Sequence, residues 1–125
     1  IATGSNPFIL PVPGKDLQGV ISYRDIQDTD EMIAAASQYR HAVVIGGGLL
    51  GLEAANGLKL RGMDVTVVHN GAWLLERQLD EVAGKMLQKS LLVYEKNITL
   101  CGTSNCHVLT SFCVSRWARL NNAMR

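Results

Sequence analysis

The stretch that decides the fold is HAVVIGGGLLGLEAANGLKLRGMDVTVVHN, residues 41–70. Its first apolar run, 42–45, contains no polar residue, which is typical of a strand in a parallel sheet that is covered on both faces. A second valine-rich run, 64–68, predicts another strand. Between the two, residues 49–60 have helical spacing, and Gly62 is placed to end that helix.

Strand, helix and strand within about 30 residues make a βαβ unit, in which the two strands are parallel and the crossover is right-handed. The sequence therefore predicts an α/β fold with a Rossmann-like βαβ unit and a parallel sheet. The helix is expected to present four residues to that sheet: Leu50, Ala54, Gly57 and Leu58.

The spacing Gly46-x-Gly48-x-x-Gly51 between strand and helix indicates a dinucleotide-binding turn. Gly46 lets the backbone turn sharply out of the strand. Gly48 lets a pyrophosphate approach the main chain, and Gly51 lets the helix pack tightly against the strand. The free amides and the dipole at the start of the helix then bind the phosphates. A turn with a purely structural role is the alternative.

The end of the second strand bears on which nicotinamide cofactor binds. NAD-binding units often carry a carboxylate there for the ribose hydroxyls, but this chain has His69, followed by Asn70. His69 can bind the ribose hydroxyls or, when protonated, a 2′-phosphate, or it is a partly exposed residue with no such role. Arg77 can also reach a phosphate, or it pairs with Glu76 or Asp80. The expected cofactor is therefore NAD(P)H, with NADH and NADPH both open.

Flanking residues predict further elements. Residues 1–23 read as irregular connection, rich in proline and turn glycines. A helix is expected over 28–40, with Asp28 and Thr29 as candidate N-caps. The apolar residues of this helix that fall near one face are Met32, Ile33, Ala36 and Tyr39.

Asp80 is expected to cap a third helix, from 81 to about 92, and residues 98–100 can form a third strand. The residues of the third helix that are spaced for one face are Val82, Met86, Lys89 and Leu92.

Composition excludes several classes of protein. The 125 residues are 47% hydrophobic and 18% charged, which is a globular composition. The net charge of +1 does not favour a nucleic acid as partner, and no apolar run is as long as a membrane span. A cytoplasmic protein is expected. Because the chain begins without methionine, inside a Pro/Gly-rich connection, we expect it to be a piece of a longer polypeptide.

The cysteines match neither a dithiol redox pair nor a common zinc pattern. We therefore expect free thiols and no metal site. The three cysteines are Cys101, Cys106 and Cys113.

The segments VVIGGGLLGLEAANGLKLRGMDVTVVH and LLERQLDEVAGKMLQ resemble the nicotinamide-binding domain of FAD-dependent pyridine-nucleotide oxidoreductases. Within that group the chain is most similar to the large subunit of assimilatory NAD(P)H nitrite reductases, with ferredoxin and rubredoxin reductases as near relatives. The opening IATGSNP resembles the segment where the FAD domain of these proteins meets the nicotinamide domain. The resemblance covers roughly residues 1–91.

The resemblance implies that Gly46, Gly48 and Gly51, with the amides near Leu49 and Leu50, hold the pyrophosphate of the cofactor. These positions match the glycine motif of the family.

Glu53 matches a family glutamate that lies near the nicotinamide end of the cofactor, or it is an ordinary solvent-facing glutamate in a first helical turn. His69 departs from the acidic residue of many relatives. The FAD fingerprint, the later Gly-Asp flavin motif and the cysteines for an iron–sulfur cluster and sirohaem do not occur in this chain. FAD, sirohaem and the cluster are therefore expected in the missing parts of the parent.

From residue 92 the chain departs from the family pattern. Residues 92–125 contain four basic residues and one acidic residue, whereas residues 1–91 contain eight basic and ten acidic residues. Three parts are expected. Residues 1–23 are the end of an FAD domain and its connection, residues 24–91 are the NAD(P)H-binding βαβ domain, and residues 92–125 are an atypical tail. The tail is either out-of-frame coding or a genuine, divergent ending.

The expected function is the NAD(P)H-binding portion of an FAD-dependent oxidoreductase, in which the full-length parent passes hydride from NAD(P)H to flavin. The missing FAD domain of the same polypeptide is the expected partner. The alternatives are a non-catalytic nucleotide-binding or regulatory module and an inert truncated product that buries too little apolar area to fold alone.

Overall fold

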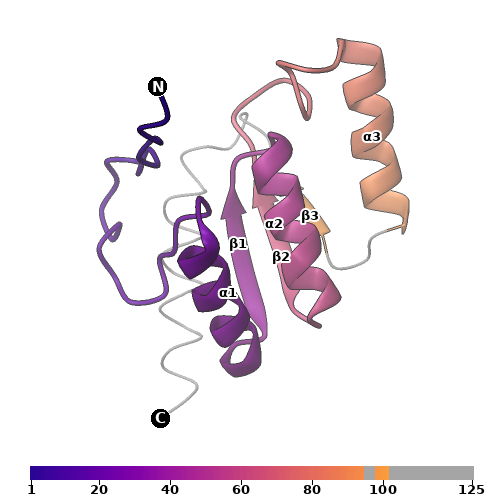
Figure 1. Ribbon diagram of the computed structural model, residues 1–125. Coiled ribbons are helices and arrows are strands. Elements are labelled where there is room, and N and C mark those ends of the chain that lie inside the picture. Colours follow the sequence, from indigo (N-terminus) through magenta and orange to yellow (C-terminus); the bar gives the residue numbers. More distant parts are fainter. Residues whose placement is uncertain (95–97, 102–125) are drawn as a thin grey trace.

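The computed structural model describes residues 1–94 and 98–101 (Figure 1). The three strands form one parallel sheet in the order β1-β2-β3, so the predicted α/β fold with a βαβ unit is confirmed. In chain order the elements are α1 (Ile26–Gln38), β1 (His41–Ile45), α2 (Leu49–Leu60), β2 (Asp64–Val68), α3 (Glu81–Tyr94) and β3 (Ile98–Cys101).

The register of the sheet puts alternate residues of neighbouring strands on one face. Ala42 of β1 pairs with Val65 of β2, and Val44 pairs with Val67. These residues contact α2, and α1 packs beside α2 on the same face of the sheet (Figure 1). The buried core of this layer consists of Ala55, Leu58, Met63, Val65 and Val67, with Met32, Ala36, Ala42, Val44 and Leu52 partly buried against it.

The expectation that β1 is covered on both faces is wrong for the residues that the structure describes. The side chains of Val43 and Ile45 are 50% and 61% exposed, because the strand alternates and only Ala42 and Val44 point toward the helices.

The sheet-facing side of α2 was predicted in part. Ala54 and Leu58 are buried as expected, and Ala55 joins them. Leu50 does not, since its side chain is 52% exposed. It lies instead beside Tyr23 and the start of α1, where these residues line a shallow pocket. Within the first turn of α2, Leu50 therefore faces the preceding connection, whereas Leu52 packs against the core on the sheet.

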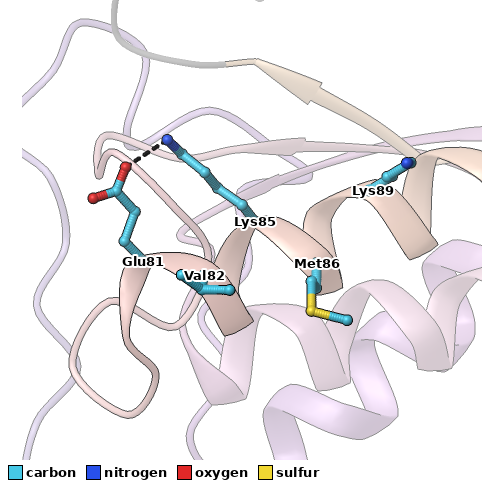
Figure 2. A pocket seen from close by; sticks show the side chains of 5 residues that line it. All are labelled: Glu81, Val82, Lys85, Met86 and Lys89. Atoms are coloured by element: carbon cyan, nitrogen blue, oxygen red, sulfur yellow. Dashed lines mark hydrogen bonds and ion pairs between the residues drawn. The ribbon is translucent and has the colours of Figure 1, made fainter.

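Two apolar residues of the face predicted for α3, Val82 and Met86, do not pack onto the sheet, and the side chain of Leu92 lies outside the described part of the chain. Val82 and Met86 are 70% and 66% exposed, and they project from the helix beside Lys89 and the Glu81–Lys85 ion pair (Figure 2).

The helix instead turns its buried Gly84 toward the preceding loop, where a Cβ at that position would overlap the indole of Trp73. Close approach at a glycine thus selects the packed face of α3, which helical spacing of apolar residues could not predict.

The start of α1 also differs from the prediction. Asp25, and neither Asp28 nor Thr29, is the N-cap, and the helix covers Ile26–Gln38 where 28–40 was expected. Asp25 accepts the N–H of Asp28 at 2.9 Å, and the carboxylate of Asp28 accepts the N–H of Asp25 at 3.3 Å. This reciprocal capping box uses an aspartate as its second member.

Asp28 should make the fold sensitive to acid. Its pKa lies below the usual aspartate value, chiefly because the Ser22 hydroxyl donates to it at 2.7 Å, and in part because the N–H groups of Arg24 and Asp25 do so, while desolvation opposes the shift. The folded-state pKa is the lower one, so this stabilisation is complete above the unfolded pKa and is lost as the pH falls through the folded pKa.

We therefore expect Asp28→Ala to lower the unfolding temperature at neutral pH and to flatten the acid side of the curve of stability against pH. Thermal unfolding by circular dichroism measures both quantities. The matched control is Asp30→Ala, because Asp30 is an exposed carboxylate in the same helix. An acid limb of Asp28→Ala that equals the wild-type limb would contradict the assignment.

The expected third strand is confirmed as β3, and the expected third helix continues to Tyr94. The domain boundary placed at residue 92 therefore falls inside α3. The predictions on Cys106, Cys113 and most of the tail concern residues outside the described part of the chain. Among the described helices, none has the length and apolar character that crossing a membrane requires.

Candidate functional site

The predicted dinucleotide turn lies where β1 ends and α2 begins. Gly46 follows the last residue of β1 and has a φ of +119°, a conformation that residues with a Cβ rarely adopt. Its N–H donates to the carbonyl of Val68 at 2.8 Å, which ties the turn to the end of β2. The turn thus sits at the carboxyl edge of the sheet, where ligands of open α/β folds bind.

Gly51 brings α2 against this turn. A Cβ built at Gly51 would overlap the carbonyl oxygen of Gly46, so only glycine permits this distance between helix and strand. The contact between Gly51 and the carbonyl of Gly46 is therefore the close packing of helix and strand that the motif predicted for Gly51.

Gly48 is the N-cap of α2, and no side chain caps the helix there. A Cβ at Gly48 would meet no atom within 4 Å, so the space in front of this residue is open. The N–H groups of Gly48, Leu49 and Leu50 lie in exposed residues, and no group in the described part of the chain accepts a hydrogen bond from them. Exposed amides at a helix N-terminus, with room before them, suit the oxygens of a diphosphate.

Gly47, which the motif leaves unassigned, is held by the loop that follows β2. It is buried, its N–H donates to Nδ1 of His69 at 3.1 Å, and its carbonyl accepts the N–H of Leu75 at 3.0 Å. A Cβ at Gly47 would lie 2.5 Å from Cδ2 of Leu74 and 2.7 Å from Cγ of His69. The middle glycine of the run 46–48 is thus required by its contacts, which the spacing of the motif did not predict.

His69 uses both ring nitrogens within the protein. Nδ1 accepts from Gly47, and Nε2 lies 2.8 Å from the carbonyl oxygen of Trp73. In this arrangement neither nitrogen is available to a ribose hydroxyl or a 2′-phosphate. The structure therefore gives His69 contacts different from those that the sequence suggested.

The loop after β2 folds back over the glycine turn. Leu74 is buried, and the indole N–H of Trp73 donates to the carbonyl of Leu79 at 3.1 Å. Leu75 has a φ of +55°, which is unusual for a residue with a side chain. The apolar pair Trp73–Leu74 in a short loop is the sequence signal that could have revealed this packing.

Glu53 and Arg77 are both exposed. Glu53 faces solvent, as its alternative interpretation expected, but it is the fifth residue of α2 and lies beyond the first turn. Arg77 forms no ion pair with Glu76, Asp80 or another carboxylate of the described residues. Asp80 instead caps α3, accepting the N–H of Ala83 at 2.8 Å, as predicted.

No group of three or more histidine, cysteine or carboxylate side chains in the described ranges is placed to hold a metal ion.

Comparison with known proteins agrees with this geometry. Residues 1–100 match the family described as pyridine nucleotide-disulphide oxidoreductase. The chain is 63% identical over 91 residues to a nitrite reductase [NAD(P)H] of Bacillus subtilis, covering 73% of this chain and 11% of that protein. It is 50% identical over 91 residues to the assimilatory nitrate reductase electron transfer subunit of the same organism, an alignment that covers 73% of this chain and 12% of that protein.

Among solved structures, NADH:rubredoxin oxidoreductase from Clostridium acetobutylicum superimposes with a TM-score of 0.73 and 27% identity, over 87% of this chain and 28% of that one. The chain thus spans about a ninth of the length of the two relatives from Bacillus. The family match extends to residue 100 and so includes most of β3. The resemblance found in the sequence is confirmed, and the chain belongs to the pyridine nucleotide-disulphide oxidoreductase family.

Proposed function

We propose that this chain is the NAD(P)H-binding part of an FAD-dependent oxidoreductase of the nitrite reductase type, in which the full-length protein passes hydride from NAD(P)H to flavin. The observation that carries the proposal is the set of exposed amides at Gly48, Leu49 and Leu50, which have no hydrogen-bond acceptor in the described part of the chain. The space beside Gly48 is open, because this residue has no side chain. A bound nicotinamide supplies the hydride, and this chain supplies its binding and orientation.

The proposed contacts divide along the cofactor. Gly46 and Gly51 shape the turn, and the amides at 48–50 donate to the pyrophosphate. Glu53, further along α2, is proposed to lie toward the nicotinamide. Arg77 is proposed to reach the adenosine side, because it is a cation with no ion pair in the described part of the chain.

The other prosthetic groups are proposed to belong to the rest of the parent protein. Only a short segment near residues 1–23 corresponds to the FAD domain, so flavin would bind mostly outside this chain. Sirohaem and an iron–sulfur cluster would likewise lie in other domains. The FAD domain of the same polypeptide is the proposed partner, and the cytoplasm is the proposed location.

Titration of the purified chain with NADH, NADPH and ADP-ribose, read by thermal unfolding, tests the proposal. A ligand at about 100 times its Kd stabilises the folded state by about 2.7 kcal/mol. We expect all three ligands to raise the unfolding temperature, since they share the diphosphate. Arg77→Ala should weaken NADPH more than NADH, because only NADPH has a 2′-phosphate. A cooperative transition that no ligand shifts would contradict the proposal.

A further inference from the structure

His69 bridges the glycine turn and the loop that follows β2. Its Nδ1 lies 3.1 Å from the amide nitrogen of Gly47, and its Nε2 lies 2.8 Å from the carbonyl oxygen of Trp73. An N–H can only donate and a carbonyl can only accept, so Nδ1 has no proton and Nε2 has one. The partners therefore require a neutral imidazole with its proton on Nε2.

Two contacts hold the peptide group before the phosphate-binding amides and the peptide group that carries the first of them, the N–H of Gly48. His69 holds the peptide between Gly46 and Gly47, because its Nδ1 accepts the N–H of Gly47. The N–H of Leu75 holds the next peptide through the carbonyl of Gly47, at 3.0 Å. A trans peptide is planar, and its N–H points away from its C=O. With the carbonyl of Gly47 turned to the loop, the N–H of Gly48 on the same peptide is turned away from it.

The turn needs such a restraint because it consists of glycines. Three consecutive glycines have more backbone freedom than any other tripeptide, and that freedom lowers affinity unless the folded protein removes it. The described turn has no side chain of its own that could do so. His69 and Leu75 provide the restraint from the neighbouring loop, and Leu74 packs against Gly47 between them.

We propose that His69 is a positioning residue, which orients the pyrophosphate-binding amides through Gly47 and does not contact the ribose of the cofactor. This inference rests on the proposed dinucleotide function. It predicts that His69 affects every ligand with a diphosphate to the same degree, whatever the ligand carries on its ribose.

Two substitutions separate the two nitrogens. The side-chain oxygen of His69→Asn can replace Nδ1 as acceptor for Gly47, whereas the amide nitrogen of His69→Gln can replace Nε2 as donor to Trp73. Loss of one hydrogen bond that fixes the turn should cost up to about tenfold in affinity. We therefore expect His69→Gln to bind NADH, NADPH and ADP-ribose about tenfold more weakly, and His69→Asn to stay within about threefold of wild type.

The measurements are Kd values for the three ligands with the 125-residue chain, and the unfolding temperature of each variant. Equal losses for the three ligands, with recovery in His69→Asn, support the positioning role. A loss confined to NADPH, or a change in the ratio of NADPH to NADH affinity, would show that His69 contacts the ribose or its phosphate and would overturn it. Unchanged affinities in His69→Gln would overturn it as well.

A measurement without ligand separates this inference from the proposed function. The ¹⁵N spectrum of the wild-type imidazole should show a proton on Nε2 and none on Nδ1, and the amide signal of Gly47 should shift in His69→Gln but much less in His69→Asn. The opposite tautomer would overturn the inference even if the cofactor binds. Absence of binding to the wild-type chain, with the expected tautomer, would instead contradict the proposed function.

Discussion

Gly51→Ala should destabilise this chain more than any other single-methyl addition in α2. The new Cβ would overlap the carbonyl oxygen of Gly46 and would lie 2.9 Å from its carbonyl carbon. Both atoms belong to the backbone, so no side chain can rotate to make room, and α2 would have to move away from β1. Overpacking of this kind costs about 2–3 kcal/mol, which lowers the unfolding temperature of a domain of this size by roughly 10 °C or more.

The same movement should weaken cofactor binding, because α2 carries the amides of Leu49 and Leu50 at its first turn. The matched control is Gly57→Ala in the same helix, where an added Cβ meets no atom within 4 Å. There the higher helix propensity of alanine should leave stability unchanged or raise it by up to about 1 kcal/mol. Equal unfolding temperatures for the two variants would contradict the close packing at Gly51.

The elements themselves were predictable because their causes are local. The bounds of α2 and β2 follow from helical spacing, from the valine-rich run and from Gly62, whose φ of +88° ends the helix. The glycine motif also placed the turn correctly between strand and helix. In these segments periodicity and backbone conformation agree with the tertiary structure, so the residues alone predict the fold.

The errors arose where particular side-chain or glycine contacts, and not the spacing of residue types, decide the outcome. The capping box of α1 depends on which of several nearby aspartates faces the helix start, and residue type alone does not distinguish Asp25 from Asp28. The packed face of α3 depends on the approach of Trp73 to Gly84. The hydrogen bond from Gly47 to His69 joins residues 22 positions apart. The spacing of residues within one segment holds no information on such pairs, so the sequence does not predict the restraint that His69 places on the turn.

Gly48→Asp should separate stability from binding, with effects of opposite sign. Gly48 is the N-cap of α2, its φ of −85° is open to any residue, and a Cβ there meets nothing within 4 Å. Aspartate is a preferred N-cap and its charge favours the helix dipole, so stability should rise by about 0.3–1 kcal/mol. The carboxylate would accept hydrogen bonds from the amides that are proposed to hold the diphosphate, and it would repel the diphosphate. Like-charge contacts cost several kcal/mol, so NADH affinity should fall by about 100-fold or more.

Gly48→Ala is the control that separates volume from charge. It adds a methyl group to the open space but no acceptor and no charge, so it should bind NADH with an intermediate affinity and lose the stability gained by aspartate. Thermal unfolding without ligand and NADH titration of the three proteins give the comparison. If Gly48→Asp binds NADH as tightly as wild type, the diphosphate does not lie before Gly48. If aspartate and alanine reduce binding equally, volume and not charge excludes the cofactor, and the amides at 48–50 lose their proposed role as the anion site.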